Sequence, residues 1–134
     1  MKIDKYKDIF LDRDGVINEV IIRDGTISSP RSFSEFKFKK DIKNFVNKFK
    51  NKNFYVVTNQ PDISRKLLEL NELQKMHKLI SEELGIEKIS FCPHNDEQNC
   101  DCRKPKAGMI NNYIKEFDLD REKCLMIGDM EKDK

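Results

Sequence analysis

Three of the four cysteines and one of the two histidines in this 134-residue chain lie within one short loop. They are Cys92, His94, Cys100 and Cys102. Thiolate sulfur and imidazole nitrogen are ligands that Zn²⁺ prefers, and four protein ligands close its coordination shell. Cys92 and His94 form one closely spaced pair, and Cys100 and Cys102 form the other. The polar stretch between the two pairs lets them face each other. We therefore expect a structural zinc site over residues 92–102, with a disulfide or scattered free thiols as the alternative.

Other groups of polar side chains follow short apolar runs in the sequence. They are Asp12 and Asp14 after the first run, Thr58 and Asn59 after the second, Lys104 beyond the third, and Asp129 and Asp133 after the fourth. A carboxylate can attack phosphorus covalently, but an anion approaches a phosphate only when cations screen the repulsion. This combination of acids, a hydroxyl group and a lysine is therefore what phosphoryl transfer through an aspartyl-phosphate needs.

Each of these side chains has an expected role in that chemistry. Asp12 is the expected nucleophile. Asp14 would protonate the leaving oxygen and later take a proton from the attacking water, because an alkoxide departs at neutral pH only when it is protonated. Thr58 and Asn59 would hold the phosphoryl oxygens, and Lys104 would neutralise them.

The same set offers oxygen ligands for Mg²⁺. The expected ligands are the carboxylate of Asp12, the backbone carbonyl of Asp14 and the carboxylate of Asp129, with Asp133 as a direct or outer ligand. The sequence thus predicts two metals with different roles, a catalytic Mg²⁺ held by oxygen and a structural Zn²⁺ held by sulfur and nitrogen.

The elements that must position these residues follow from the apolar pattern. Continuous apolar runs at 8–12, 54–58, 88–92 and 123–127 indicate strands that are covered on both faces. Helical periods lie between them at 41–52, 71–84 and 110–117, with a capping-box pair of Asn71 and Gln74 and a stop at Gly85. Strands that alternate with helices predict an α/β fold with a three-layer, Rossmann-like parallel sheet. Such sheets gather their chemistry at the carboxyl ends of the strands.

Length and charge narrow the class of protein. The length suits one domain over residues 1–134, and the net charge of +2 with interspersed signs gives no reason to expect a nucleic-acid partner. No apolar run is long enough to span a membrane, and the first run is too short for a signal peptide, so we expect a cytoplasmic protein. His77 and Cys124 are expected to pack within a helix and a strand rather than to bind a ligand.

Four short motifs resemble those of the haloacid dehalogenase-like phosphatases. They are Asp12-x-Asp14-Gly-Val, Thr58-Asn-Gln, Arg103-Lys104-Pro and Gly128-Asp129-x-x-x-Asp133, which stand in the order of the family's motifs I to IV. The resemblance runs from about residue 8 to the end of the chain. The cysteine and histidine loop is similar to that of the zinc-containing branch, which holds the D-glycero-D-manno-heptose-1,7-bisphosphate 7-phosphatases and the histidinol-phosphate phosphatases.

The resemblance implies a Mg²⁺-dependent phosphatase of a small phosphorylated metabolite, with a heptose 1,7-bisphosphate as the leading substrate. Histidinol phosphate is the alternative substrate. The intervals between motifs are each filled by one strand and one helix, so no large cap domain fits. Only the loops at residues 19–36 and 61–66 and the zinc loop can shape the site. Arg103 and Arg65 are the candidates for binding a second phosphate or a sugar hydroxyl group.

Two departures from the family pattern bear on function. Motif II usually continues with glycine and later with Arg-Gly, whereas this chain has a different sequence at residues 61–66. Relatives also continue beyond motif IV with a further helix, strand and helix. We therefore expect a truncated sheet whose last strand is an exposed edge that favours self-association. An inactive, zinc-bound binding module is the alternative of another class.

Overall fold

A four-stranded parallel sheet forms the centre of the protein. The computed structural model describes residues 4–93 and 108–128. In spatial order the strands are β5 (Ile89–Cys92), β4 (Asn53–Asn59), β1 (Asp8–Leu11) and β6 (Cys124–Ile127). Every neighbouring pair is parallel. The predicted α/β sheet is confirmed, and the observed strands agree with the predicted runs to within one or two residues.

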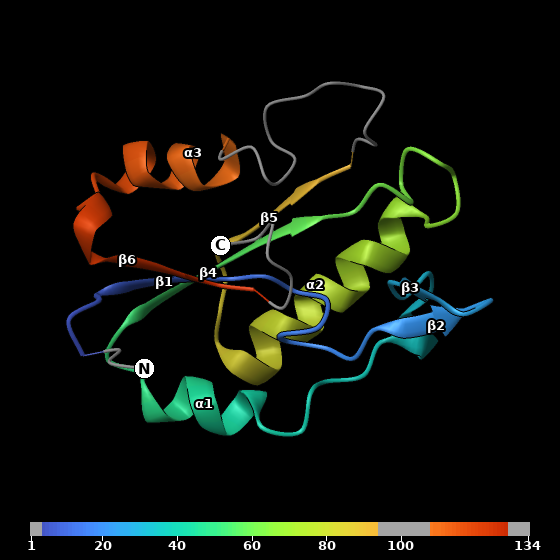
Figure 1. The fold of residues 1–134 in the computed structure, drawn as a ribbon, viewed down its shortest axis with the longest axis horizontal. Coiled ribbons are helices and arrows are strands. Elements are labelled where there is room, and N and C mark those ends of the chain that lie inside the picture. The colour runs from blue at the N-terminus through green and yellow to red at the C-terminus, as the bar shows by residue number, and fades with distance from the viewer. Residues whose placement is uncertain (1–3, 94–107, 129–134) are drawn as a thin grey trace.

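Helices cover both faces of this sheet (Figure 1). They are α1 (Ile42–Lys48), α2 (Leu70–Leu84) and α3 (Gly108–Phe117). The predicted capping box at Asn71 is wrong, because α2 begins one residue earlier, after Glu69, and no side chain caps it. Its predicted end is confirmed, since Gly85 follows in the left-handed conformation with φ of 71°. α1 is shorter than predicted, because residues 49–52 turn back towards β4.

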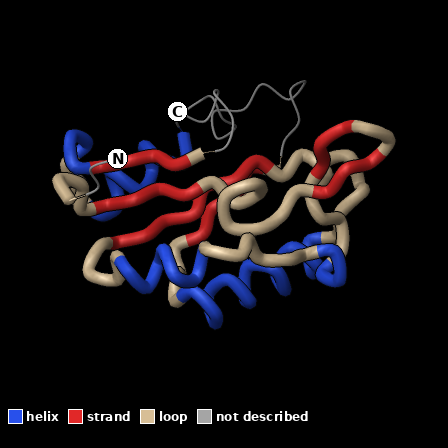
Figure 2. Tube along the Cα trace, turned by 60° about the horizontal axis from the view of Figure 1, so that its bottom comes forward, coloured by secondary structure: helices blue, strands red, loops and turns tan. Residues whose placement is uncertain are grey.

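The two faces of the sheet have separate cores because side chains alternate along each strand. On one face Ile9, Leu11 and Val56 pack against buried residues of α1 and α2. On the other face Phe10 and Tyr55 stack with ring centroids 4.7 Å apart and pack against α3. The three layers of helix, sheet and helix are visible in Figure 2. The prediction of one domain over residues 1–134 extends past the described residues and stays a prediction.

A small antiparallel hairpin was not predicted. β2 (Ile21–Arg23) and β3 (Thr26–Ser28) pair in the region that the sequence indicated only as a loop. Asp24 and Gly25 join them with φ of 51° and 76°, which is the conformation that an Asp-Gly pair adopts in a tight hairpin turn. The signal was therefore present in the sequence. The guanidinium of Arg23 ties the hairpin to Glu35, with its shorter contact at 2.6 Å.

β6 lies at one edge of the sheet and, within the described residues, pairs only with β1. Self-association through this edge stays a prediction. Cys124 was expected to be buried, but at this edge it is only half-buried, and its Sγ donates to the carbonyl of Asp120 at 3.4 Å. Among the described helices, none combines the length and the apolar character needed to cross a membrane.

Candidate active site

The first candidate site residue lies at the carboxyl end of β1. Asp12 is 7% exposed, and its Oδ1 accepts a hydrogen bond from the backbone N–H of Arg13 at 2.8 Å. Its own N–H donates to the carbonyl of Ile127 at 3.0 Å, so β1 and β6 end side by side. The carboxylate that was predicted to be the nucleophile therefore sits on the rim of the sheet, as expected.

The chain turns tightly after Asp12. The carbonyl of Arg13 accepts from the backbone N–H groups of three residues, at 2.8–3.2 Å, and the turn includes Gly15 with φ of 89°. A side chain at that φ would be strained, which accounts for the glycine of motif I. The turn brings Asn18 back beside Asp14, and the two residues form an isolated bridge.

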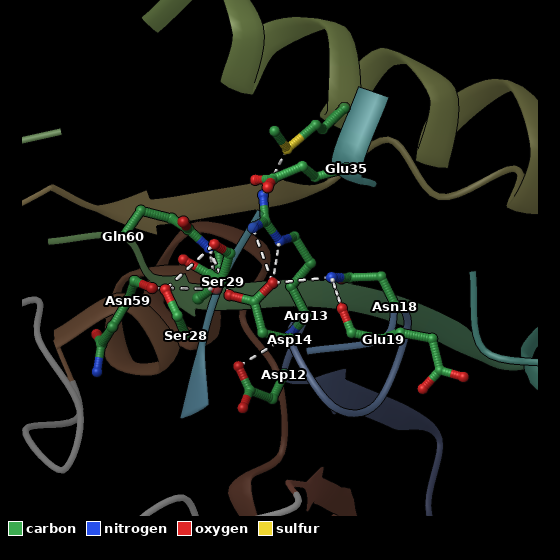
Figure 3. Close-up of polar contacts among 12 residues, drawn as sticks. Asp12, Arg13, Asp14, Asn18, Glu19, Ser28, Ser29, Glu35, Asn59 and Gln60 are labelled. Atoms are coloured by element: carbon green, nitrogen blue, oxygen red, sulfur yellow. Dashed lines mark hydrogen bonds and ion pairs between the residues drawn. The ribbon is translucent and has the colours of Figure 1, made fainter. Parts of the chain in front are cut away.

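The carboxylate of Asp14 accepts four hydrogen bonds (Figure 3). Oδ1 accepts from Nε and Nη2 of Arg13 at 3.0 and 2.8 Å and from Nδ2 of Asn18 at 2.9 Å. Oδ2 accepts one bond, from Nε2 of Gln60 at 2.9 Å. The side chain of Asp14 is 17% exposed. It is therefore held from several sides while keeping an opening towards solvent.

Arg13 is the largest fully buried side chain of the described residues. Its charge is paired with Asp14, and its Nη1 lies 3.3 Å from Nε2 of His77 and 3.5 Å from Sδ of Met76 on α2. The ring of Phe36 lies 5.6 Å from the guanidinium carbon. Arginine only donates, so the contact with His77 requires the neutral tautomer with the proton on Nδ1.

Motif II reaches the same rim from β4, which lies beside β1. Thr58 is 1% exposed, and its Oγ1 accepts a hydrogen bond from Nε2 of Gln60 at 3.0 Å. The side chain of Asn59 points away from Asp14 (Figure 3). The structure thus brings Thr58 towards the two acids, whereas the amide of Asn59 faces another direction.

The loop after motif II is organised by a buried carboxylate, Asp62. It is 4% exposed and accepts from Nε of Arg31 at 2.9 Å and from Nη1 of Arg65 at 3.3 Å. Arg65, a predicted substrate-binding residue, remains about half exposed. Lys66 adopts φ of 62°, in the left-handed region that favours glycine. The loop therefore contains a left-handed residue that is not glycine.

Several predicted site residues lie outside the described residues. They are His94, Cys100, Cys102, Arg103, Lys104, Asp129 and Asp133. Cys92 is described: it ends β5, is fully buried and is disulfide-bonded in the structure, the alternative that the sequence left open. No group of three or more histidine, cysteine or acidic side chains that could hold a metal occurs within residues 4–93 and 108–128.

A surface cavity of about 340 Å³ lies at the other end of the sheet. Asn53 and Phe54, at the amino end of β4, line it together with Gly85, which follows α2. In parallel α/β sheets ligands bind outside the carboxyl ends of the strands. We therefore place the candidate site at the rim with Asp12, and not in this cavity.

The sequence did not single out three residues that shape the site, Arg13, Asn18 and Gln60. Arg13 and Gln60 stand within motifs and Asn18 lies two positions after motif I, and this nearness was the available signal. Their roles depend on contacts across the fold, since Gln60 reaches Asp14 from the neighbouring strand and Arg13 reaches α2. Arg31 and Asp62 were missed for the same reason.

The contact between Arg13 and His77 generates a prediction about stability. Burial, followed by the adjacent guanidinium of Arg13, lowers the pKa of His77 from 6.5 to about 3. Between pH 6.5 and 3 the imidazole of His77 is therefore protonated in the unfolded chain and neutral in the folded protein. The free energy of unfolding falls as the pH drops through this range. We expect wild type to lose about 1 kcal/mol more than His77→Gln between pH 7.0 and 5.5, measured by urea unfolding. Identical losses in both proteins would contradict this assignment.

Known proteins resemble the chain along most of its length. The family model described as polynucleotide kinase 3 phosphatase matches residues 10–132. A D-glycero-beta-D-manno-heptose-1,7-bisphosphate 7-phosphatase from Neisseria meningitidis serogroup A is 38% identical over 130 residues, covering 93% of this chain and 68% of the relative. The enzyme of that name from Helicobacter pylori strain 26695 is 36% identical over 135 residues, covering 95% of this chain and 75% of the relative.

A solved structure agrees with these relatives. The crystal structure of a D,D-heptose 1,7-bisphosphate phosphatase from B. bronchiseptica, complexed with magnesium and phosphate, has a TM-score of 0.84 and 27% identity, covering 95% of this chain and 72% of that one. A second structure, of a HAD-like phosphatase from Mesorhizobium loti with a TM-score of 0.77 and 24% identity, shares the fold. The rim geometry and these similarities together show that the chain belongs to the polynucleotide kinase 3 phosphatase family of the haloacid dehalogenase-like phosphatases.

Proposed function

We propose that this chain is a Mg²⁺-dependent phosphatase that hydrolyses the 7-phosphate of D-glycero-D-manno-heptose 1,7-bisphosphate through an aspartyl-phosphate on Asp12. One observation carries the proposal: Asp12 and Asp14 stand on one rim, and Asp14 is bound there by Gln60 of motif II. Two carboxylates with different surroundings suit two different tasks. The buried one attacks, and the one that is partly open to solvent handles the proton.

The protein's own residues would share the reaction as follows. An oxygen of Asp12 forms a bond to phosphorus while the bond from phosphorus to the sugar oxygen breaks. Asp14 gives its proton to that sugar oxygen, then takes a proton from the water that attacks the aspartyl-phosphate and frees Asp12. The hydroxyl group of Thr58 holds a phosphoryl oxygen. Lys104 is proposed to neutralise the phosphoryl group.

Oxygen donors at the rim fit Mg²⁺. The carboxylate of Asp12 and the backbone carbonyl of Asp14 are hard ligands. Asp129 and Asp133 lie two and six residues after the end of β6 in the sequence. When bound, the ion would neutralise charge on the phosphoryl oxygens as Asp12 approaches. A related heptose bisphosphate phosphatase was crystallised with magnesium and phosphate, which supports the choice of metal.

The choice of substrate rests on the relatives. Seven of the similar proteins are named heptose-1,7-bisphosphate 7-phosphatases, at 32–38% identity. A bifunctional histidine-biosynthesis protein from Campylobacter jejuni is 34% identical, but the match covers only 37% of its length. This similarity makes histidinol phosphate the second candidate substrate. Arg65, Arg103 and Asn59 are proposed to contact the substrate beyond the scissile phosphate. A small phosphorylated sugar, and not a nucleic acid, is the proposed partner.

The nucleophile can be tested directly. Asp12→Asn should lower kcat by at least about 10³-fold, because a neutral amide does not attack phosphorus. Asp14→Asn should slow formation and hydrolysis of the aspartyl-phosphate, since it serves both steps. Mass spectrometry of acid-quenched wild type should find phosphate on Asp12. Phosphate on a histidine, or full activity in Asp12→Asn, would refute the mechanism.

A comparison of substrates tests the specificity. We expect kcat/KM for heptose 1,7-bisphosphate to exceed that for histidinol phosphate by about tenfold or more, because a site built for a second anionic group discriminates against a ligand that lacks it. Phosphate release is the readout, and 4-nitrophenyl phosphate serves as a generic substrate. Preference for histidinol phosphate would favour the second candidate. Absence of turnover with all three would favour a binding module without activity.

We further propose that the reduced loop of residues 92–102 binds a structural Zn²⁺ through Cys92, His94, Cys100 and Cys102. Three thiolates and one imidazole make the donor set of a closed tetrahedral site. The disulfide at Cys92 is the oxidised alternative, and a sulfur in a disulfide is not a zinc ligand. The zinc would hold Arg103 and Lys104, which follow the last ligand, in place at the rim.

Metal analysis under reducing conditions tests the zinc site. Wild type should carry about one zinc per chain, and Cys100→Ser should lose the metal, melt at a lower temperature and lose activity. The same change at the free thiol, Cys124→Ser, is the control and should leave the zinc content unchanged. Freshly reduced protein without zinc, in which Cys92 and Cys100 are alkylated at once, would rule out the site.

A further inference from the structure

The four hydrogen bonds of Asp14 are divided unequally between its two oxygens. Oδ1 receives three donors, two from Arg13 and one from Asn18. Oδ2 receives one, from Gln60. A carboxylate offers about four acceptor positions in total, two on each oxygen. Oδ1 is therefore saturated, and the remaining position of this carboxylate lies on Oδ2.

Gln60 sets the direction of that remaining position. Its Nε2 carries two protons, and it donates to Oδ2 of Asp14 at 2.9 Å and to Oγ1 of Thr58 at 3.0 Å. One amide group thus spans the candidate acid and the hydroxyl group that would hold a phosphoryl oxygen. Figure 3 shows the amide of Gln60 directed towards Asp14. With both protons used, the spacing between these two groups is fixed by a single side chain.

The position of Gln60 is fixed in turn by the fold. The residue is fully buried, and its backbone N–H donates to the carbonyl of Cys92 at 2.7 Å, which ties it to the end of β5. Its Oε1 has no hydrogen-bond partner among the described residues. Turning the amide over would point Oε1 at the carboxylate of Asp14 and repel it. The orientation shown satisfies Asp14 and Thr58 at the expense of the amide's own oxygen.

We propose that Gln60 is a positioning residue that aims Oδ2 of Asp14 at the leaving oxygen of the substrate. This inference rests on the proposed function and specifies which oxygen of Asp14 carries the transferred proton, namely Oδ2. As the bond from phosphorus to the sugar oxygen breaks, the proton on Oδ2 moves to that oxygen. Arg13 and Asn18 hold the other oxygen of Asp14 and prevent its rotation.

Leaving-group dependence separates this role from a general structural one. A sugar alkoxide needs a proton to depart, whereas 4-nitrophenolate departs without one. Gln60→Met keeps the length of the side chain and removes its donors. We expect kcat/KM for heptose 1,7-bisphosphate and for histidinol phosphate to fall by about 10- to 100-fold, and kcat/KM for 4-nitrophenyl phosphate by less than about threefold. The quantity kcat/KM is the right readout because it covers formation of the aspartyl-phosphate, while its hydrolysis is common to all substrates.

Two further variants complete the experiment. Gln60→Glu has the same shape but cannot donate to Asp14 when ionised, and it should show the same selective loss if Gln60→Met fails to fold. Asn53→Ala removes a matched bond between an amide and a carboxylate, from Nδ2 to Oδ1 of Asp8 at 3.0 Å, at the opposite end of the sheet. It should affect all substrates equally and little.

The outcomes are distinct. A loss confined to the sugar and alkyl phosphates supports the role of Gln60. An equal loss on all substrates, or no loss on any, overturns it while leaving the proposed phosphatase activity intact. Failure of wild type to release phosphate from every substrate overturns the proposed function, and this inference with it.

Discussion

The buried ion pair between Arg13 and Asp14 is the constraint on which the site depends. A guanidinium with no exposure to water carries a desolvation cost of several kcal/mol, and the pair is tolerated only where further hydrogen bonds satisfy both partners. Asp14 receives those bonds from Asn18 and Gln60, and Arg13 lies against His77. The contacts of this one ion pair therefore hold three parts of the fold in fixed positions: the turn after β1, the end of β4 and one face of α2.

The order of the strands makes this arrangement possible. β4 lies directly beside β1, so Thr58 and Gln60 reach the same rim as Asp12 although they lie far away in the sequence. β6 flanks β1 on the other side, and the carbonyl of Ile127 accepts from the N–H of Asp12. Short parallel strands that end at one level thus gather side chains from separate motifs. The chemistry belongs to this edge and not to any single motif.

The side of the rim near the hairpin is organised by a second buried charge. Asp62 binds Arg31, which follows β3, and Arg65, which follows β4, so the hairpin region and the loop after motif II are joined. This pairing gives the unusual sequence at residues 61–66 a structural explanation. Lys66 is in the left-handed conformation, which residues other than glycine adopt at some cost in energy. The ion pairs of Asp62 hold the loop in which this strained residue lies.

The sequence by itself determined the sheet, its helices and the two acids of motif I, because these depend on local apolar period and on residues adjacent in the chain. The Asp-Gly turn of β2 and β3 was equally local, but its strands are too short for the period to stand out. Only the tertiary structure decided that Gln60 binds Asp14 and that Arg13 is buried against His77, since these contacts join residues more than 40 positions apart and depend on strand order. Composition reveals which residues could meet, and packing determines which of them do.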